Sequence, residues 1–91
     1  MKLIATPRFE RAAKKLNKIE KTALDEAVQV IAVNPALGEM KKGDLAGVRV
    51  YKFRLKAHLI LLAYKVAKEE GAIKLLAFGS HENFYRGLKA G

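Results

Sequence analysis

The chain has 91 residues, 51% hydrophobic and 30% charged, which predicts a single folded domain over residues 1–91 rather than a disordered chain. It has no cysteine and two histidines, which excludes a disulfide scaffold, a cysteine nucleophile and a thiolate metal site, so we expect neither a metal nor another cofactor. Eighteen Lys and Arg against nine Asp and Glu give a net charge of +9, which calls for an anionic partner such as nucleic acid or an acidic protein.

The N-terminal third is predicted to form a strand and two helices. Met1–Ala5 reads as a short strand, and Thr6 followed by Pro7 is typical of a helix start. A second helix is expected from about Ile19 to Val33, ended by Asn34-Pro35. The apolar residues recur at helical spacing in both segments: Phe9, Ala12, Ala13 and Leu16, then Leu24, Ala27, Val28 and Ile31. Two successive helices indicate a helical hairpin.

After a glycine-containing loop over 35–47, the hydrophobic period changes from helical to stranded. Residues 51–56 alternate apolar and basic side chains, and Leu59–Val66 is a nearly continuous apolar run, as in a central strand. A turn at 68–71 leads to a further buried strand, Ile73–Phe78, which Gly79-Ser80 is expected to end. A short C-terminal helix is predicted over His81–Leu88.

These elements predict an α+β fold in the order β-α-α-β-β-β-α. Short turns between the last three strands favour an antiparallel meander, with the paired N-terminal helices packed on one face. The N-terminus lacks a long apolar segment and no apolar run approaches the length of a membrane span, so we expect a cytoplasmic protein without a membrane partner.

The first candidate site is a row of cations on the strand at 51–56. Lys52, Arg54 and Lys56 alternate with apolar residues, so they should stand in one line about 7 Å apart, a spacing that suits a phosphate backbone. An ordinary solvent-facing strand would look the same. Arg49 in the same basic block and His58, expected in the adjacent turn, are further candidates for phosphate or RNA binding.

The second candidate site lies near the C-terminus. On a helix His81 and Tyr85 are four residues apart and share one face, while Phe84 and Leu88 can enter the core. Histidine exchanges protons near neutral pH, and tyrosine offers a ring for base stacking. A polar cap at His81 and core packing by Tyr85 is the alternative reading. Arg86 is an additional candidate for phosphate binding.

Together these residue types match the needs of RNA cleavage by transesterification. When the 2′-hydroxyl attacks the adjacent phosphate, no metal is required: the reaction needs a base, cations for the developing charge, and a proton for the leaving 5′-oxygen. His81, Tyr85, Lys52 and Arg54 are therefore the candidate catalytic residues.

The order and spacing of several segments resemble the RelE/ParE superfamily, the toxins of bacterial type II toxin–antitoxin systems. The resemblance rests on the paired helices, the loop Lys42–Gly47, the strand Tyr51–Leu55, the segment Leu62–Val66 and the ending Gly79–Tyr85, which is similar to that of YafQ-type members. It implies a compact sheet with helices on one side, a basic site, and a neutralising acidic antitoxin as partner. By position, Lys52 and Arg54 match a basic pair of RelE-like members.

The resemblance also implies a choice of activity. RelE-type members cleave mRNA on the ribosome, and we expect this activity with His81 as the matching catalytic histidine and Tyr85 as the closing aromatic. ParE-type members instead poison DNA gyrase. Two arginines of RelE-like members are absent here, where the chain has Leu61 and Ala77-Phe78-Gly79, so gyrase poisoning or a weakened nucleic-acid-binding protein are the alternatives.

Overall fold

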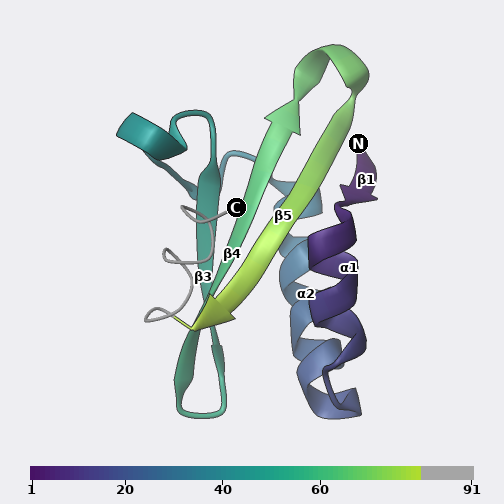
Figure 1. The fold of residues 1–91 in the computed structure, drawn as a ribbon. Coiled ribbons are helices and arrows are strands. Elements are labelled where there is room, and N and C mark those ends of the chain that lie inside the picture. Colours follow the sequence, from purple (N-terminus) through teal and green to yellow (C-terminus); the bar gives the residue numbers. More distant parts are fainter. Residues whose placement is uncertain (81–91) are drawn as a thin grey trace.

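The computed structural model describes residues 1–80, which form a five-stranded sheet with two helices on one face (Figure 1). The strands lie in the order β1-β5-β4-β3-β2 across the sheet. Their bounds are β1 Lys2–Ala5, β2 Glu39–Met40, β3 Arg49–Leu55, β4 His58–Ala67 and β5 Ala72–Ser80. The helices are α1 Pro7–Lys14 and α2 Lys18–Val33, and two short 3₁₀ turns, η1 Gly43–Leu45 and η2 Lys68–Glu70, lie in the connections.

Both helices begin where side chains satisfy their first backbone N–H groups. Thr6 accepts a hydrogen bond from the Phe9 N–H at 3.2 Å, and Pro7 occupies the first turn, which confirms the predicted start of α1. α2 begins at Lys18, one residue before the predicted start. Asn17 and Glu20 form a reciprocal capping box there, with bonds of 2.8 and 3.0 Å. The pair fixes the α1–α2 corner.

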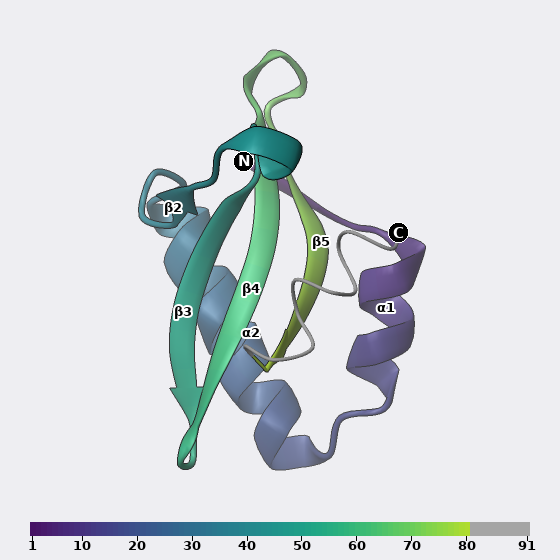
Figure 2. The ribbon, with the colours of Figure 1, turned by 60° about the vertical axis from the view of Figure 1, so that its left-hand side comes forward.

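The main core lies between the helices and the sheet. The predicted apolar stripe of α2 is buried, and the Phe9 ring of α1 packs edge-on against Phe78 of β5, with centroids 5.2 Å apart. Figure 2 shows α2 behind β3 and β4 and α1 beside β5, with the opposite face of these strands turned to the viewer. The core comprises Phe9, Leu24, Ala27, Val28, Ile31, Leu62, Tyr64, Ile73 and Leu75. The packing confirms the predicted helix-on-sheet architecture.

The sheet follows the predicted meander, with β3, β4 and β5 antiparallel and β1 added parallel to β5 at one edge. β4 is the central strand, and Leu61, Leu62, Ala63 and Tyr64 are fully buried, two in the cluster on each face of the sheet. This explains the continuous apolar run in its sequence. On the face away from the helices, Leu61 and Ala63 join Val48 and Val50 in a second apolar cluster.

Two features of the sheet differ from the sequence prediction. The loop predicted at 35–47 contains β2, which pairs antiparallel with the start of β3 but is too short to show an alternating pattern. β5 runs through Gly79 and Ser80 instead of ending before them, because these residues continue the pairing with Leu61 and Ile60. The predicted C-terminal helix, His81–Leu88, lies outside the described residues.

A β-bulge interrupts the pairing of β4 and β5. Ala63 is opposite Ala77 and Tyr64 is opposite Leu75, which leaves Leu76 as an extra residue on β5. Leu75 and Phe78 therefore both face the helices, although they are three positions apart. Beyond the bulge, Gly79 lies on the same face as its partner Leu61.

Candidate nucleic-acid interface

The sheet face opposite the helices carries the predicted cations. Tyr51 and Phe53 pack toward the helices and Val50 toward the other side, so strand alternation places Lys52 and Arg54 on the face away from the helices. We call this the basic face; its basic residues on β3, β4 and β5 are Lys52, Arg54, Lys65 and Lys74. Lys52 and Arg54 are exposed and about 7 Å apart along β3, as predicted.

Lys56 does not extend this row, contrary to the sequence prediction. β3 ends at Leu55, and Lys56 with Ala57 forms the two-residue turn to β4. Lys56 has φ 57°, in the left-handed region, so its backbone no longer follows the strand direction. The aligned cations of β3 are therefore two rather than three.

His58 is the first residue of β4 instead of a turn residue. It is exposed and directly opposite Leu55, whose strand position alternates toward the helix side. By the same alternation, His58 lies on the side opposite Lys52 and Arg54. The structure thus brings His58 near the end of the cationic strand without placing it on the basic face.

Arg49 also lies on the helix side of the sheet. It is opposite Tyr64, and its Nη1 donates hydrogen bonds to the carbonyl oxygens of Ala36 at 3.3 Å and Gly38 at 2.8 Å. The guanidinium therefore holds the loop that follows α2. Two-residue alternation from Tyr51 already places Arg49 on this face, so the signal is present in the sequence.

Tyr64 holds the same loop from inside the core. Its buried hydroxyl donates to the Pro35 carbonyl at 2.7 Å and accepts from the Gly38 N–H at 2.8 Å. Burial raises the pKa of this phenol, while the Gly38 hydrogen bond and the nearby Arg49 charge act in the opposite direction. A Cβ atom at residue 38 would lie 2.6 Å from the Tyr64 oxygen, so this close approach requires glycine.

Leu61, and Gly79 of the segment Ala77-Phe78-Gly79, where the resemblance leads us to expect arginines, fall in one row with Lys52. Lys52 is directly opposite Leu61 on β4, and Leu61 is opposite Gly79 on β5. Leu61 is fully buried in the apolar cluster of this face. The row across the basic face therefore consists of Lys52, Leu61 and Gly79, and only Lys52, at its β3 end, is positively charged.

A carboxylate from β2 lies near Lys52. Glu39 of β2 is opposite Val50 and accepts a 3.0 Å hydrogen bond from Lys41. Lys41, through this bond and its charge, lowers the pKa of Glu39, and the charge of Lys52 lowers it further. Glu39 therefore stays ionised and weakens the positive potential next to Lys52. β2 has only two residues, too few for an alternating pattern, so the sequence alone does not reveal Glu39 as a neighbour of Lys52.

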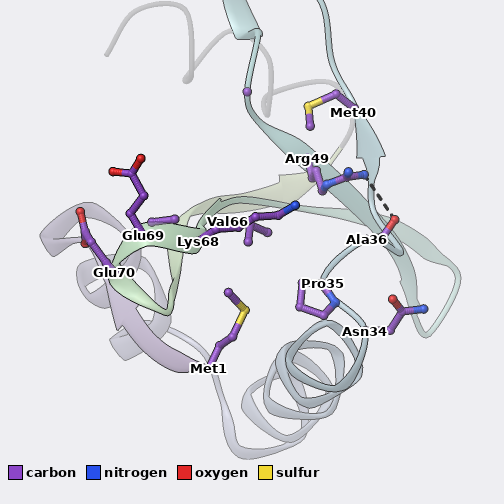
Figure 3. Close-up of a pocket in the computed structure, with 12 residues that line it drawn as sticks. Met1, Asn34, Pro35, Ala36, Met40, Arg49, Val66, Lys68, Glu69 and Glu70 are labelled. Atoms are coloured by element: carbon purple, nitrogen blue, oxygen red, sulfur yellow. Dashed lines mark hydrogen bonds between the residues drawn. The ribbon is translucent and has the colours of Figure 1, made fainter.

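A surface pocket, or hollow, lies away from Lys52 and Arg54. It has a volume of about 720 Å³ and lies between the N-terminus, the loop after α2 and the β4–β5 hairpin (Figure 3). Met1, Pro35 and Met40 contribute apolar wall, and Lys68 and Glu70 lie at the hairpin. Its one arginine, Arg49, already donates to Ala36 in Figure 3. The hollow therefore offers a mixed surface without a convergent set of catalytic groups among residues 1–80.

The C-terminal candidates His81, Tyr85 and Arg86 lie outside the described residues. The last described residue, Ser80, is exposed and opposite Ile60, which in turn is opposite Phe53, so β5 ends beside the part of the sheet that carries Lys52 and Arg54. Within residues 1–80, no group of three His, Asp or Glu side chains is arranged to hold a metal ion. Neither described helix combines the length and apolar character needed to cross a bilayer.

Comparison with known proteins identifies the family and the fold. Residues 3–89 match the family described as ParE-like toxin of type II bacterial toxin–antitoxin system. No curated protein matches the sequence. Among solved structures, the toxin in the intact Escherichia coli RelBE toxin–antitoxin complex is similar with a TM-score of 0.70 and 19% identity, covering 87% of this chain and 94% of the other.

Two further solved structures show the same fold. The isolated E. coli RelE toxin has a TM-score of 0.69 and 18% identity, covering 98% of this chain and 96% of that one. A chain of the RelBE2 toxin–antitoxin complex from Mycobacterium tuberculosis has a TM-score of 0.71 and 20% identity, covering 88% and 90%. These similarities confirm the α+β fold expected from the sequence.

Proposed function

The chain belongs to the ParE-like toxins of type II bacterial toxin–antitoxin systems, in the RelE/ParE superfamily, and we propose that it inhibits translation by cleaving mRNA on the ribosome without a metal. The observation that carries the proposal is the pair Lys52 and Arg54. Both are exposed on the face away from the helices, and neither forms an ion pair with a described carboxylate. Unpaired cations in a line favour a phosphate backbone as ligand.

In the proposed reaction the 2′-hydroxyl oxygen bonds to the adjacent phosphorus while the bond to the 5′-oxygen breaks, leaving a 2′,3′-cyclic phosphate and a 5′-hydroxyl. Lys52 and Arg54 stabilise the negative charge that builds on the phosphoryl oxygens. His81 exchanges protons with the reacting hydroxyls, and Tyr85 stacks on a base. His81 follows Ser80 in sequence, and Ser80 belongs to the same part of the sheet as the two cations.

The test of this proposal uses induced expression in bacteria that lack the antitoxin. We expect His81→Ala with Tyr85→Ala, and separately Lys52→Gln with Arg54→Gln, to relieve growth inhibition while the purified proteins stay folded. Cuts within reading frames, mapped by primer extension after brief induction, should disappear in both variants. Full toxicity of a folded His81→Ala/Tyr85→Ala protein would reject the assigned roles.

A second function, gyrase poisoning, is favoured by the row Lys52–Leu61–Gly79. This row lacks positive charge at two of its three positions, so the face offers less stabilisation to a phosphorane than two arginines would supply. Growth inhibition with uncut mRNA and with cleaved DNA–gyrase complexes would assign the toxin to this activity. Absence of any growth effect would instead favour a weakened nucleic-acid-binding protein.

We also propose a cognate antitoxin with an acidic, amphipathic segment as the protein partner. The solved relatives include toxins in complex with their antitoxins. The net charge of +9 favours an acidic partner and steers its approach. Association rates should therefore fall steeply as salt rises from 0.05 to about 0.5 M, the range in which surface charges become screened. Rates that do not change with salt would contradict this steering.

A further inference from the structure

The basic face carries a second pair of cations that the proposed mechanism does not use. Lys65 on β4 and Lys74 on β5 are directly opposite each other, and both alternate to the side away from the helices. Residues directly opposite on antiparallel strands have Cβ atoms about 5 Å apart, and like charges at this spacing destabilise the sheet. A bound anion between them would remove this repulsion.

Carboxylates compensate the pair only in part. Glu70 lies 3.5 Å from the Lys74 Nζ, a long and largely exposed contact of the kind that contributes little to stability. Lys65 is exposed and forms no ion pair with a described residue, and its aliphatic chain lies beside Gly47. The pair therefore keeps uncompensated positive charge at the surface.

The distance between the Lys65–Lys74 pair and Lys52 favours a polymeric anion as the ligand. Lys65 is four residues beyond Leu61, the partner of Lys52, so the two sites are about 14 Å apart along β4. This distance is longer than the separation of neighbouring phosphates, so a strand that contacts both sites spans a few nucleotides between them, as strands in single-strand-binding grooves do. One nucleic-acid strand can thus place phosphates at both sites.

Among residues 1–80, the strands of the basic face offer no exposed large apolar side chain that a docking helix could bury. The exposed large hydrophobic residues of the described chain lie on β1, α2, β2 and the loops beside them, and none is on β3, β4 or β5. Helices that dock on a protein bury apolar side chains at the centre of the contact. A surface with exposed cations and no apolar anchor favours a phosphate backbone.

We propose that Lys65 and Lys74 form a second phosphate-binding site, which holds the RNA strand a few nucleotides from the phosphate at Lys52 and Arg54. The proposal rests on the proposed function, because it assumes that RNA lies on the basic face. It assigns to these lysines a role in holding the strand, with no part in bond cleavage.

The test measures binding of a fluorescent 12-nucleotide oligouridine to the full chain by anisotropy between 0.05 and 0.3 M salt. Each lost phosphate contact should lower the slope of log K against log salt by about 0.7, or about fivefold in affinity at 0.1 M salt. We expect Lys65→Gln/Lys74→Gln to lose two such steps. Lys18→Gln/Lys21→Gln, which removes two exposed charges from α2, is the matched control and should change affinity less than twofold.

A Lys52→Gln/Arg54→Gln variant separates the two possible failures. If it weakens RNA binding and Lys65→Gln/Lys74→Gln does not, the second site is rejected and the proposed function stands. If neither variant weakens binding, RNA does not lie on this face and both proposals fail. If Lys65→Gln/Lys74→Gln binds RNA normally but loses affinity for the antitoxin, the pair belongs to the protein partner and the RNA site is rejected. Thermal unfolding should show Lys65→Gln at least as stable as the wild type, because the substitution removes a destabilising like-charge contact.

Discussion

Substituting Tyr64 by Phe should destabilise the toxin although it removes a single oxygen atom. The hydroxyl bridges Pro35 and Gly38 with bonds of 2.7 and 2.8 Å inside the core. A buried polar group that loses its partner costs about 1–3 kcal/mol, and here two groups lose theirs. We expect the free energy of unfolding to fall by about 2–3 kcal/mol, and Tm by roughly 10–20 °C for a domain of this size.

Chemical denaturation followed by circular dichroism measures this loss. Tyr51→Phe is the matched control, because the Tyr51 ring stacks beside Phe53 and its hydroxyl forms no hydrogen bond with a described residue. It should change stability by less than about 0.5 kcal/mol, as is usual for surface substitutions. A Tyr64→Phe protein as stable as Tyr51→Phe would refute the reasoning that this hydroxyl holds the loop after α2.

The same residue predicts an alkaline pH dependence. Burial raises the pKa of Tyr64 in the folded state above the ordinary value near 10. Its contribution to stability is therefore complete below pH 10 and is lost as the pH rises through the folded-state pKa, because only the unfolded chain ionises easily. Between pH 10 and 11, the stability of the wild type should fall more steeply than that of Tyr64→Phe. Parallel curves would contradict the assigned shift.

Three further substitutions test separate parts of the structure. Lys56→Gly relieves a left-handed backbone at φ 57° and should raise the free energy of unfolding by about 1 kcal/mol; a loss of stability would contradict the turn geometry. Asn17→Ala removes the cap of α2 and should cost about 1 kcal/mol in urea denaturation, whereas Thr22→Ala, away from the cap, should not. Glu39→Gln removes the carboxylate beside Lys52 and should tighten binding of oligouridine about twofold or more; weaker binding would mean that Glu39 positions Lys41 for the ligand.

The sequence was sufficient to predict the helices, the meander and the exposure of Lys52 and Arg54, because each follows from a local period or a capping residue. It was insufficient where position depends on pairing between strands. β2 exists because Glu39 and Met40 meet the start of β3, and two residues carry no period. Lys65 and Lys74 lie in runs that read as buried strands, and only the register makes them neighbours. Arg49 is predicted to bind phosphate because of its charge, although strand alternation places it on the helix side of the sheet.

The extra residue, Leu76, determines which face of the sheet each following residue of β5 lies on. If Leu76 paired with Ala63 instead of bulging out, the rest of β5 would shift by one place against β4: Phe78 would turn away from Phe9, and Gly79 would leave its place opposite Leu61. Removing Leu76 outright would keep every pair intact, since the two flanking halves would simply join. The bulge at Leu76 therefore determines which side of the sheet Ser80, four residues later, faces at the end of β5.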